Sequence, residues 1–341
     1  MGAIMPTSGS WNYQVTALQV ITDAAEDIGV IANGQTPNSG DLATFLRTLN
    51  LLAKQWQGRS DKFPGLKIWT RQRLVLFLTA NQVVYNVGPA STDDRASVNS
   101  LATTLGADKA ANATSVTVTS TTGMTAADII GVVTDAGTIG WGTISTVDSA
   151  TGLTLAANSI GAAASGKVVY TYTSKAQRFV ECESVVLRDN STAGDPIDMP
   201  IQVYTDVQQY ESLGQKFADG DPTAILIEPF RLNTRITTNF APPNLWKTLR
   251  LTVQYPAEDY DDATGADDIA FPQEYFAALS AELGMRSCKK FGKKWTPELE
   301  KAYQVAVVEG INLNPQNTSK HFLPGLEDNS SSLPMTPPST P

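Results

Sequence analysis

The sequence predicts an α+β protein. Its expected architecture is an α-helical core, made by an N-terminal helical hairpin and two C-terminal helices, with β-strands, an inserted small all-β domain and an extended C-terminal tail. Three observations lead to this prediction. Apolar residues recur at helical spacing near both ends of the chain, short β-branched runs alternate through its middle, and prolines crowd its final segment.

The N-terminal hairpin is predicted from two apolar stripes. Residues 14–30 form the first expected helix, with a stripe at three- and four-residue steps made by Val15, Leu18, Thr22, Ala25 and Ile28. Residues 40–57 form the second, with the stripe Leu42, Phe45, Leu49, Leu52 and Trp56. The short link between them lets each helix cover the apolar face of the other.

The middle of the chain reads as strands. Residues 96–174 contain six charged side chains, namely Asp108, Lys109, Asp128, Asp135, Asp148 and Lys167. Short alternating runs separated by turn signals predict a sandwich- or barrel-like module in this region. The expected domains are therefore the core with its hairpin and first strands at 1–90, an inserted β domain at 91–175, the core's later strands and C-terminal helices at 176–311, and the tail at 312–341.

Two more helices are predicted near the C-terminus. Pro272 is a favoured first position for one, with Glu274 at its start and four lysines at its end that complement the helix dipole. The segment Thr296-Pro297-Glu298 opens the other. Its expected apolar stripe is Leu299, Tyr303, Ala306, Val307 and Ile311.

The tail, residues 312–341, contains six prolines and cannot form a packed element alone. It still carries spaced apolar or aromatic anchors suited to docking in extended form on a partner. These candidate partner-binding residues are His321, Phe322, Leu323, Leu326, Leu333 and Met335. The alternative is a tail with incidental hydrophobic residues, and the sequence favours neither.

Several chemistries are expected to be absent. The chain has one histidine, His321, so Ser-His-Asp and Cys-His catalysis and zinc sites built from His and Cys are not expected. No phosphate-loop or dinucleotide-binding motif occurs. We therefore expect no enzyme, no cofactor and no metal. Cys182 and Cys288 are expected to be free, buried thiols.

The net charge and the hydrophobicity of the chain limit which binding partners are expected. The formal net charge is -9, and the one basic cluster is Lys289, Lys290, Lys293 and Lys294, so tight nucleic-acid binding is not expected. No apolar run is long enough for a membrane span, and the N-terminus lacks a secretory signal. The acidic stretch 258–268 is interpreted as a solvated connector before a helix. A catalytic carboxylate pair or a calcium site are the alternatives there.

The chain resembles the head-to-tail adaptor family of short-tailed phages, also called tail accessory or packaged-DNA stabilisation proteins. The passages that carry the resemblance are Thr16–Val30, Leu49–Trp56, Thr252–Tyr260, Phe271–Phe276 and the helix from Ala278 to Cys288. The order of these elements matters more than any single motif.

The resemblance implies a virion structural protein, assembled in the host cytoplasm and located at the head–tail interface. It implies a homo-oligomeric ring, expected to be a dodecamer, between the portal protein and a tail nozzle or hub protein. The ring would extend and seal the channel through which double-stranded DNA passes without specific binding, and the tail at 312–341 would bind the portal. The alternatives are a tail nozzle, tube or receptor-binding protein, and a cell-wall glycan hydrolase or glycan-binding protein.

Overall fold

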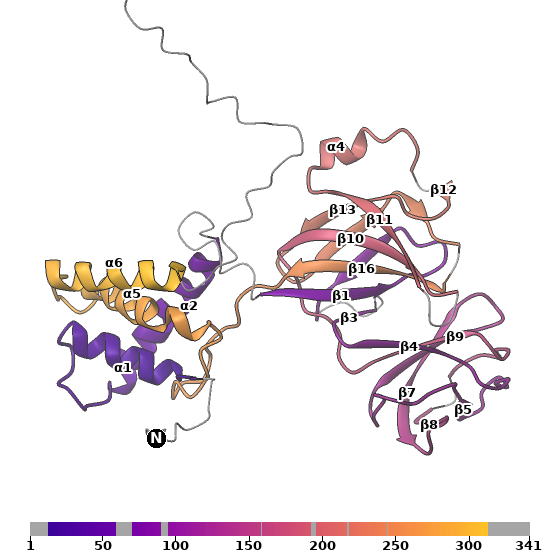
Figure 1. Ribbon diagram of the computed structural model, residues 1–341, viewed down its shortest axis with the longest axis horizontal. Helices are drawn as coiled ribbons and strands as arrows, with labels where there is room; N and C mark the ends of the chain where they lie inside the picture. The colour runs from indigo at the N-terminus through magenta and orange to yellow at the C-terminus, as the bar shows by residue number, and fades with distance from the viewer. Residues whose placement is uncertain are drawn as a thin grey trace, which may run out of the picture. The chain divides into compact units, whose positions relative to one another are not determined.

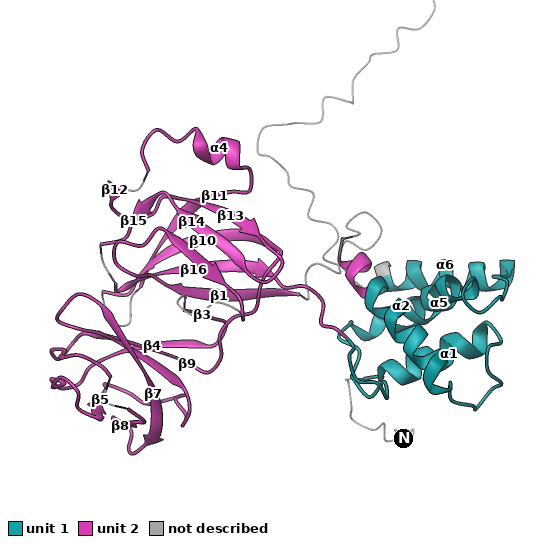
Figure 2. Ribbon diagram, turned by 180° about the vertical axis from the view of Figure 1, so that it is seen from behind, with its two compact units in different colours: residues 1–52, 59–65, 260–341 teal, residues 53–58, 66–259 magenta. Residues whose placement is uncertain are grey.

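The computed structural model describes residues 13–58, 70–89, 95–157, 159–191, 196–216, 218–243 and 245–312. The chain divides into two compact units, coloured separately in Figure 2. The helical unit comprises residues 1–52, 59–65 and 260–341, and the β unit comprises residues 53–58 and 66–259. Both ends of the chain thus belong to one unit, and the strands between them form the other.

In its described residues, the helical unit contains four α-helices, labelled in Figure 1, and one 3-10 turn. They are α1 (Ala17–Asp27), α2 (Ser39–Gly58, whose last six residues belong to the β unit), η1 (Gln273–Tyr275), α5 (Phe276–Cys288) and α6 (Pro297–Asn312). Helix α5 is central, since it packs against both α1 and α6. Phe45 of α2 stacks on Phe291, which follows α5, with ring centroids 4.7 Å apart. The hairpin and the C-terminal helices therefore share one core.

Local chemistry fixes where α1 starts and how closely it approaches α5. The Thr16 hydroxyl accepts a hydrogen bond from the Gln19 backbone N–H, and the Gln19 side chain accepts one from the Thr16 N–H, which forms a capping box. A Cβ at Gly284 on α5 would lie 3.2 Å from the Ile28 side chain. The absence of a side chain at Gly284 thus permits the close helix contact.

The larger sheet of the β unit has eight strands in the order β2-β14-β13-β11-β10-β16-β1-β3 and is nearly closed, like a barrel. The strands are β1 (Arg71–Phe77), β2 (Val84–Val87), β3 (Ala96–Ser97), β10 (Glu181–Asp189), β11 (Ile197–Tyr204), β13 (Ala224–Pro229), β14 (Thr234–Thr238) and β16 (Lys247–Gln254). Alternate residues point inward, so that Leu74, Leu76, Leu249 and Leu251 are buried together. A short helix, α4 (Val207–Glu211), and the strand pair β12 (Ala218–Asp219) and β15 (Phe240–Ala241) complete this part.

The second sheet of the β unit has six strands in the order β4-β9-β6-β7-β8-β5. They are β4 (Ser100–Thr104), β5 (Ser115–Thr117), β6 (Ile129–Val133), β7 (Ile139–Val147), β8 (Gly152–Leu155) and β9 (Val168–Tyr172). Gly131 of β6 pairs with Trp141 of β7, and any Cβ at residue 131 would collide with the indole ring. Glycine here makes room for the aromatic side chain.

Phe77 joins the two sheets within the β unit. Its ring lies 4.9 Å from that of Tyr170 and 5.8 Å from that of Tyr172, both on β9, and 5.4 Å from the Trp141 ring. The Tyr170 hydroxyl donates to the Leu245 carbonyl at 3.0 Å. Burial raises the pKa of Tyr170, so its hydroxyl stays protonated as a donor. An aromatic cluster therefore packs one sheet against the other.

The predicted fold class is wrong. The structure is 33% strand and 24% helix, and its largest element is the eight-stranded sheet, so the protein is mainly β and is not built on an α-helical core. Strands expected to accompany the helices instead pair with one another, with β1 beside β16 and β2 beside β14. These strands bury a hydrophobic core of their own. They therefore form a separate unit instead of packing against the helices.

Candidate functional site

The outer surface of α6 carries apolar side chains that its own unit does not cover. Tyr303, Ala306 and Val307 are half-buried, whereas Val305 is 48% exposed and Val308 is 54% exposed. Residues three apart lie on the same helix face, so the two valines form one patch, called here the α6 surface. The two valines give the helix a small apolar area that the described part of its own unit leaves exposed.

A buried carboxylate determines how α6 lies on α5. Glu282 of α5 is fully buried and accepts hydrogen bonds from the Arg286 Nε at 3.0 Å and Nη2 at 2.6 Å. The Tyr303 hydroxyl of α6 donates to its other oxygen at 3.0 Å. A buried carboxylate with several donors is stable only while the donors stay in place. This network therefore fixes which face of α6 turns inward and which carries the valines.

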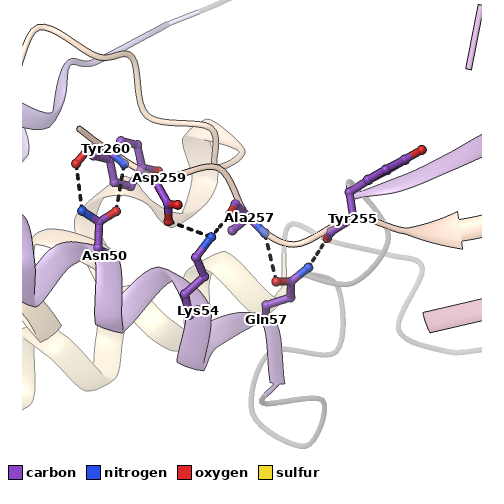
Figure 3. Close-up of polar contacts among 7 residues, drawn as sticks. All are labelled: Asn50, Lys54, Gln57, Tyr255, Ala257, Asp259 and Tyr260. Carbon is purple, nitrogen blue, oxygen red and sulfur yellow. Dashed lines mark hydrogen bonds and ion pairs between the residues drawn. The ribbon is translucent and has the colours of Figure 1, made fainter. Parts of the chain in front are cut away.

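Three side chains on one face of α2 bind the backbone that follows β16 (Figure 3). Gln57 donates to the Tyr255 carbonyl and accepts from the Ala257 N–H at 2.9 Å. Lys54 donates to the Ala257 carbonyl, and its ammonium lies 2.9 Å from the Asp259 carboxylate.

Asn50 is the third of these side chains, and its contact lies within the helical unit. Its amide donates to the Tyr260 carbonyl and accepts from the Tyr260 N–H, both at 2.8 Å. The helix side chains thus supply the backbone of 255–260 with partners that a strand would otherwise provide. Residues 50, 54 and 57 share a face because they are spaced by four and three positions.

The acidic stretch is engaged in local hydrogen bonds. Asp262 accepts from the Thr264 backbone N–H at 2.6 Å and from its hydroxyl at 2.5 Å, which lowers the pKa of Asp262. Asp267 accepts from the Asp262 N–H at 2.9 Å. Within the described ranges, no group of three or more His, Cys, Asp or Glu side chains could hold a metal ion. These contacts support the interpretation of a connector loop.

Two of the four lysines in the basic cluster make hydrogen bonds within the helical unit. The Lys290 ammonium donates to the Thr48 hydroxyl at 2.6 Å, and the Lys293 ammonium donates to the Gly29 carbonyl at 2.5 Å.

The prediction of free, buried cysteines is confirmed for Cys182 and Cys288. Burial raises the pKa of Cys182 to about 12, so this thiol is a weak nucleophile at neutral pH.

A second apolar surface lies in the β unit, at the turn between β13 and β14. Phe230 is 46% exposed and Leu232 is 64% exposed. The Phe230 N–H donates to the Asn233 carbonyl at 2.8 Å, which closes the turn and holds both side chains at its tip. Sequence patterning missed this surface because Phe230 and Leu232 flank an arginine and look like ordinary strand residues.

The predicted partner-binding residues lie outside the described residues, as do the prolines of the tail. These partner-binding residues are His321, Phe322, Leu323, Leu326, Leu333 and Met335. The described part of the tail segment is Asn312, the last residue of α6. The assignment of these anchors to a partner therefore stays a prediction.

A scan against models of protein families finds no match for the chain, and a search of curated proteins finds none either. Among the described helices, none combines the length and the apolar character needed to cross a membrane.

Proposed function

We propose that this protein is a virion structural protein, a head-to-tail adaptor that forms a ring beneath the portal of a short-tailed phage. The observation that carries the proposal is the α6 surface. Val305 and Val308 face outward from a helical unit assembled from both ends of the chain. Such a surface fits side-by-side packing of identical copies, in which one chain covers the valines of the next.

The order of elements supports the same proposal. The resemblance to the adaptor family rests on an N-terminal helical hairpin and two later helices. In this chain, those helices form one unit, and the β unit occupies the sequence between α2 and η1. An insertion placed in this way can enlarge a subunit while the helical part keeps its own contacts.

Each partner has a candidate surface. Neighbouring copies would pack through the α6 surface, and the portal would receive the tail anchors between His321 and Met335. The tail nozzle or hub would contact the exposed turn at Phe230 and Leu232. DNA would pass through the ring without specific binding, in keeping with a net charge of -9.

The test is co-sedimentation of the purified chain with purified portal rings. We expect the full chain to sediment with the portal, and deletion of residues 312–341 to abolish this while the remaining chain stays folded. A finer variant changes Phe322, Leu323 and Leu326 to serine. It should weaken binding strongly, because the variant replaces the apolar side chains that the portal would bury with polar ones.

The matched control changes Asn329, Ser330 and Ser331 to alanine, three polar positions in the same tail, and should bind as the full chain does. Equal binding by the deletion variant would refute the role of the tail. If the full chain does not sediment with bare portal rings, the result would favour the alternative of a nozzle protein.

A further inference from the structure

The β unit contains an open cleft of about 380 Å³ between its two sheets. One side is formed by β4 together with Thr119 and Val168, and the other by Arg188, Asn190 and Arg250. A volume of this size lies at the lower end of the range for small-molecule sites. None of the sequence motifs predicts it, because its two sides come from separate parts of the chain.

Two arginines enter the cleft from neighbouring strands. In the antiparallel pairing of β10 with β16, Arg188 lies opposite Thr248 and Arg250 lies opposite Val186. Leu187, Leu249 and Leu251 point to the interior of the eight-stranded sheet. Because side chains alternate along a strand, Arg188 and Arg250 project together from the other face.

The two arginines differ in their partners. Arg188 donates from Nε to Asp198 Oδ1 at 2.6 Å and from Nη2 to Asp198 Oδ2 at 2.5 Å, which is a bidentate ion pair. The Arg250 Nε is buried and has no hydrogen-bond partner among the described residues. A buried donor without an acceptor is unfavourable, and a charged one more so.

The surroundings of Arg250 compensate its positive charge only in part. Desolvation lowers the pKa of Arg250, and the positive charges of Arg188 and Arg73 lower it further, whereas Asp198 raises it. Yet Asp198 already uses both carboxylate oxygens on Arg188. The cleft therefore holds more positive than negative charge, in a chain whose net charge is -9.

The opposite side of the cleft adds neutral polar groups. Strand β4 is the outermost strand of its sheet, so alternate backbone N–H groups face away from β9. The Thr104 and Thr119 hydroxyls lie 2.7 Å apart, and each can rotate to donate a hydrogen bond to a bound ligand. Guanidinium, hydroxyl and backbone N–H groups together are the donors that bind oxyanions.

We propose that this cleft binds a compact oxyanion of the phosphate class, carried by a small molecule, with Arg250 as its main ligand and Arg188 as a second. The tetrahedral anion would accept from the Arg250 guanidinium where this group lines the cleft, and it would balance the excess positive charge. A DNA backbone would need a row of cations along a surface. Here two arginines on neighbouring strands, one of them bound to Asp198, line one cleft. The proposal is independent of the adaptor function.

The experiment titrates the full-length protein with inorganic phosphate, and separately with sulfate and glycerol 3-phosphate, at constant ionic strength set with chloride. Calorimetry should show saturable binding to the wild type. Arg250→Gln should weaken phosphate binding roughly tenfold or more, as expected for loss of a charge-assisted hydrogen bond. Arg250→Lys, which keeps the charge but lacks the planar fork, should give an intermediate affinity, and it decides the question if the glutamine variant does not fold.

Arg235→Gln is the matched control. Arg235 lies on β14 of the same sheet, also has a buried Nε without a partner, and lies 4.0 Å from Glu228, but it does not line the cleft. It should bind phosphate as the wild type does. The proposal is overturned if no anion saturates the wild type, if both glutamine variants weaken binding equally, or if duplex DNA binds at Arg250 and free phosphate does not.

Discussion

Glu282 of the helical unit and Arg250 of the β unit both hold charged-group atoms away from water, but these atoms differ in their hydrogen-bond partners. Glu282 in the helical unit accepts three hydrogen bonds, two from Arg286 and one from Tyr303. Arg250 in the β unit has a buried Nε without any partner in the described residues. The paired carboxylate of Glu282 holds α6 on α5. The unpaired Nε of Arg250 belongs to a side chain that lines a cleft, which the Arg235 side chain does not, and this combination fits a site that a ligand completes.

The largest effect that tests this comparison is expected at Glu282. Glu282→Ala would remove a buried carboxylate to which both Arg286 and the Tyr303 hydroxyl donate. We expect the helical unit to lose about 3 kcal/mol of unfolding free energy, at the lower end for a broken buried pair because Arg286 keeps some contact with water. Denaturant unfolding followed by circular dichroism at the helical band would measure it.

The control for that experiment is Glu309→Ala, which removes an exposed carboxylate from α6 and should change stability by less than about 0.5 kcal/mol. If Glu282→Ala were as mild as this control, the carboxylate would not be what fixes α6 on α5, and the orientation of the α6 surface would need another explanation.

A much smaller effect, without loss of stability, is expected at Arg250. In phosphate-free buffer, Arg250→Gln should unfold within about 0.5 kcal/mol of the wild type or be slightly more stable, because it removes a half-buried guanidinium whose buried Nε has no hydrogen-bond partner among the described residues. Thermal unfolding of the two proteins side by side would show this. A loss as large as that of Glu282→Ala would mean that Arg250 is structural, and the contrast between the two units would disappear.

Much of the local structure could be predicted from the sequence. The stripe of Leu42, Leu49 and Trp56 predicts a helix at 40–57, and α2 spans Ser39–Gly58 with all three side chains buried. The region 96–174, in which short strands are expected, contains all six strands of the second sheet, from β4 to β9. Such elements follow from the nearest ten or so residues, in which apolar spacing is decided.

Long-range pairing could not be predicted in this way. Strands β1 and β16 lie far apart in the chain, and nothing in either run specifies that Leu76 pairs with Leu249. For this reason the sequence does not predict the eight-stranded sheet, and the predicted α-helical core is wrong. The cleft could not be predicted for the same reason. Nothing in the sequence around Arg188 or Arg250 indicates a site, and the two side chains lie side by side only because β10 pairs with β16.

The most direct test of the adaptor function is electron microscopy of purified portal rings mixed with three forms of the chain. These are the wild type, the double variant Val305→Glu with Val308→Glu, and the double variant Phe230→Glu with Leu232→Glu. We expect the wild type and the β-turn variant to form a second ring stacked on the portal, and the α6 variant to form none, because charges would replace its apolar contact between copies. Rings formed equally well by the α6 variant, or bare portals in the presence of the wild type, would contradict it.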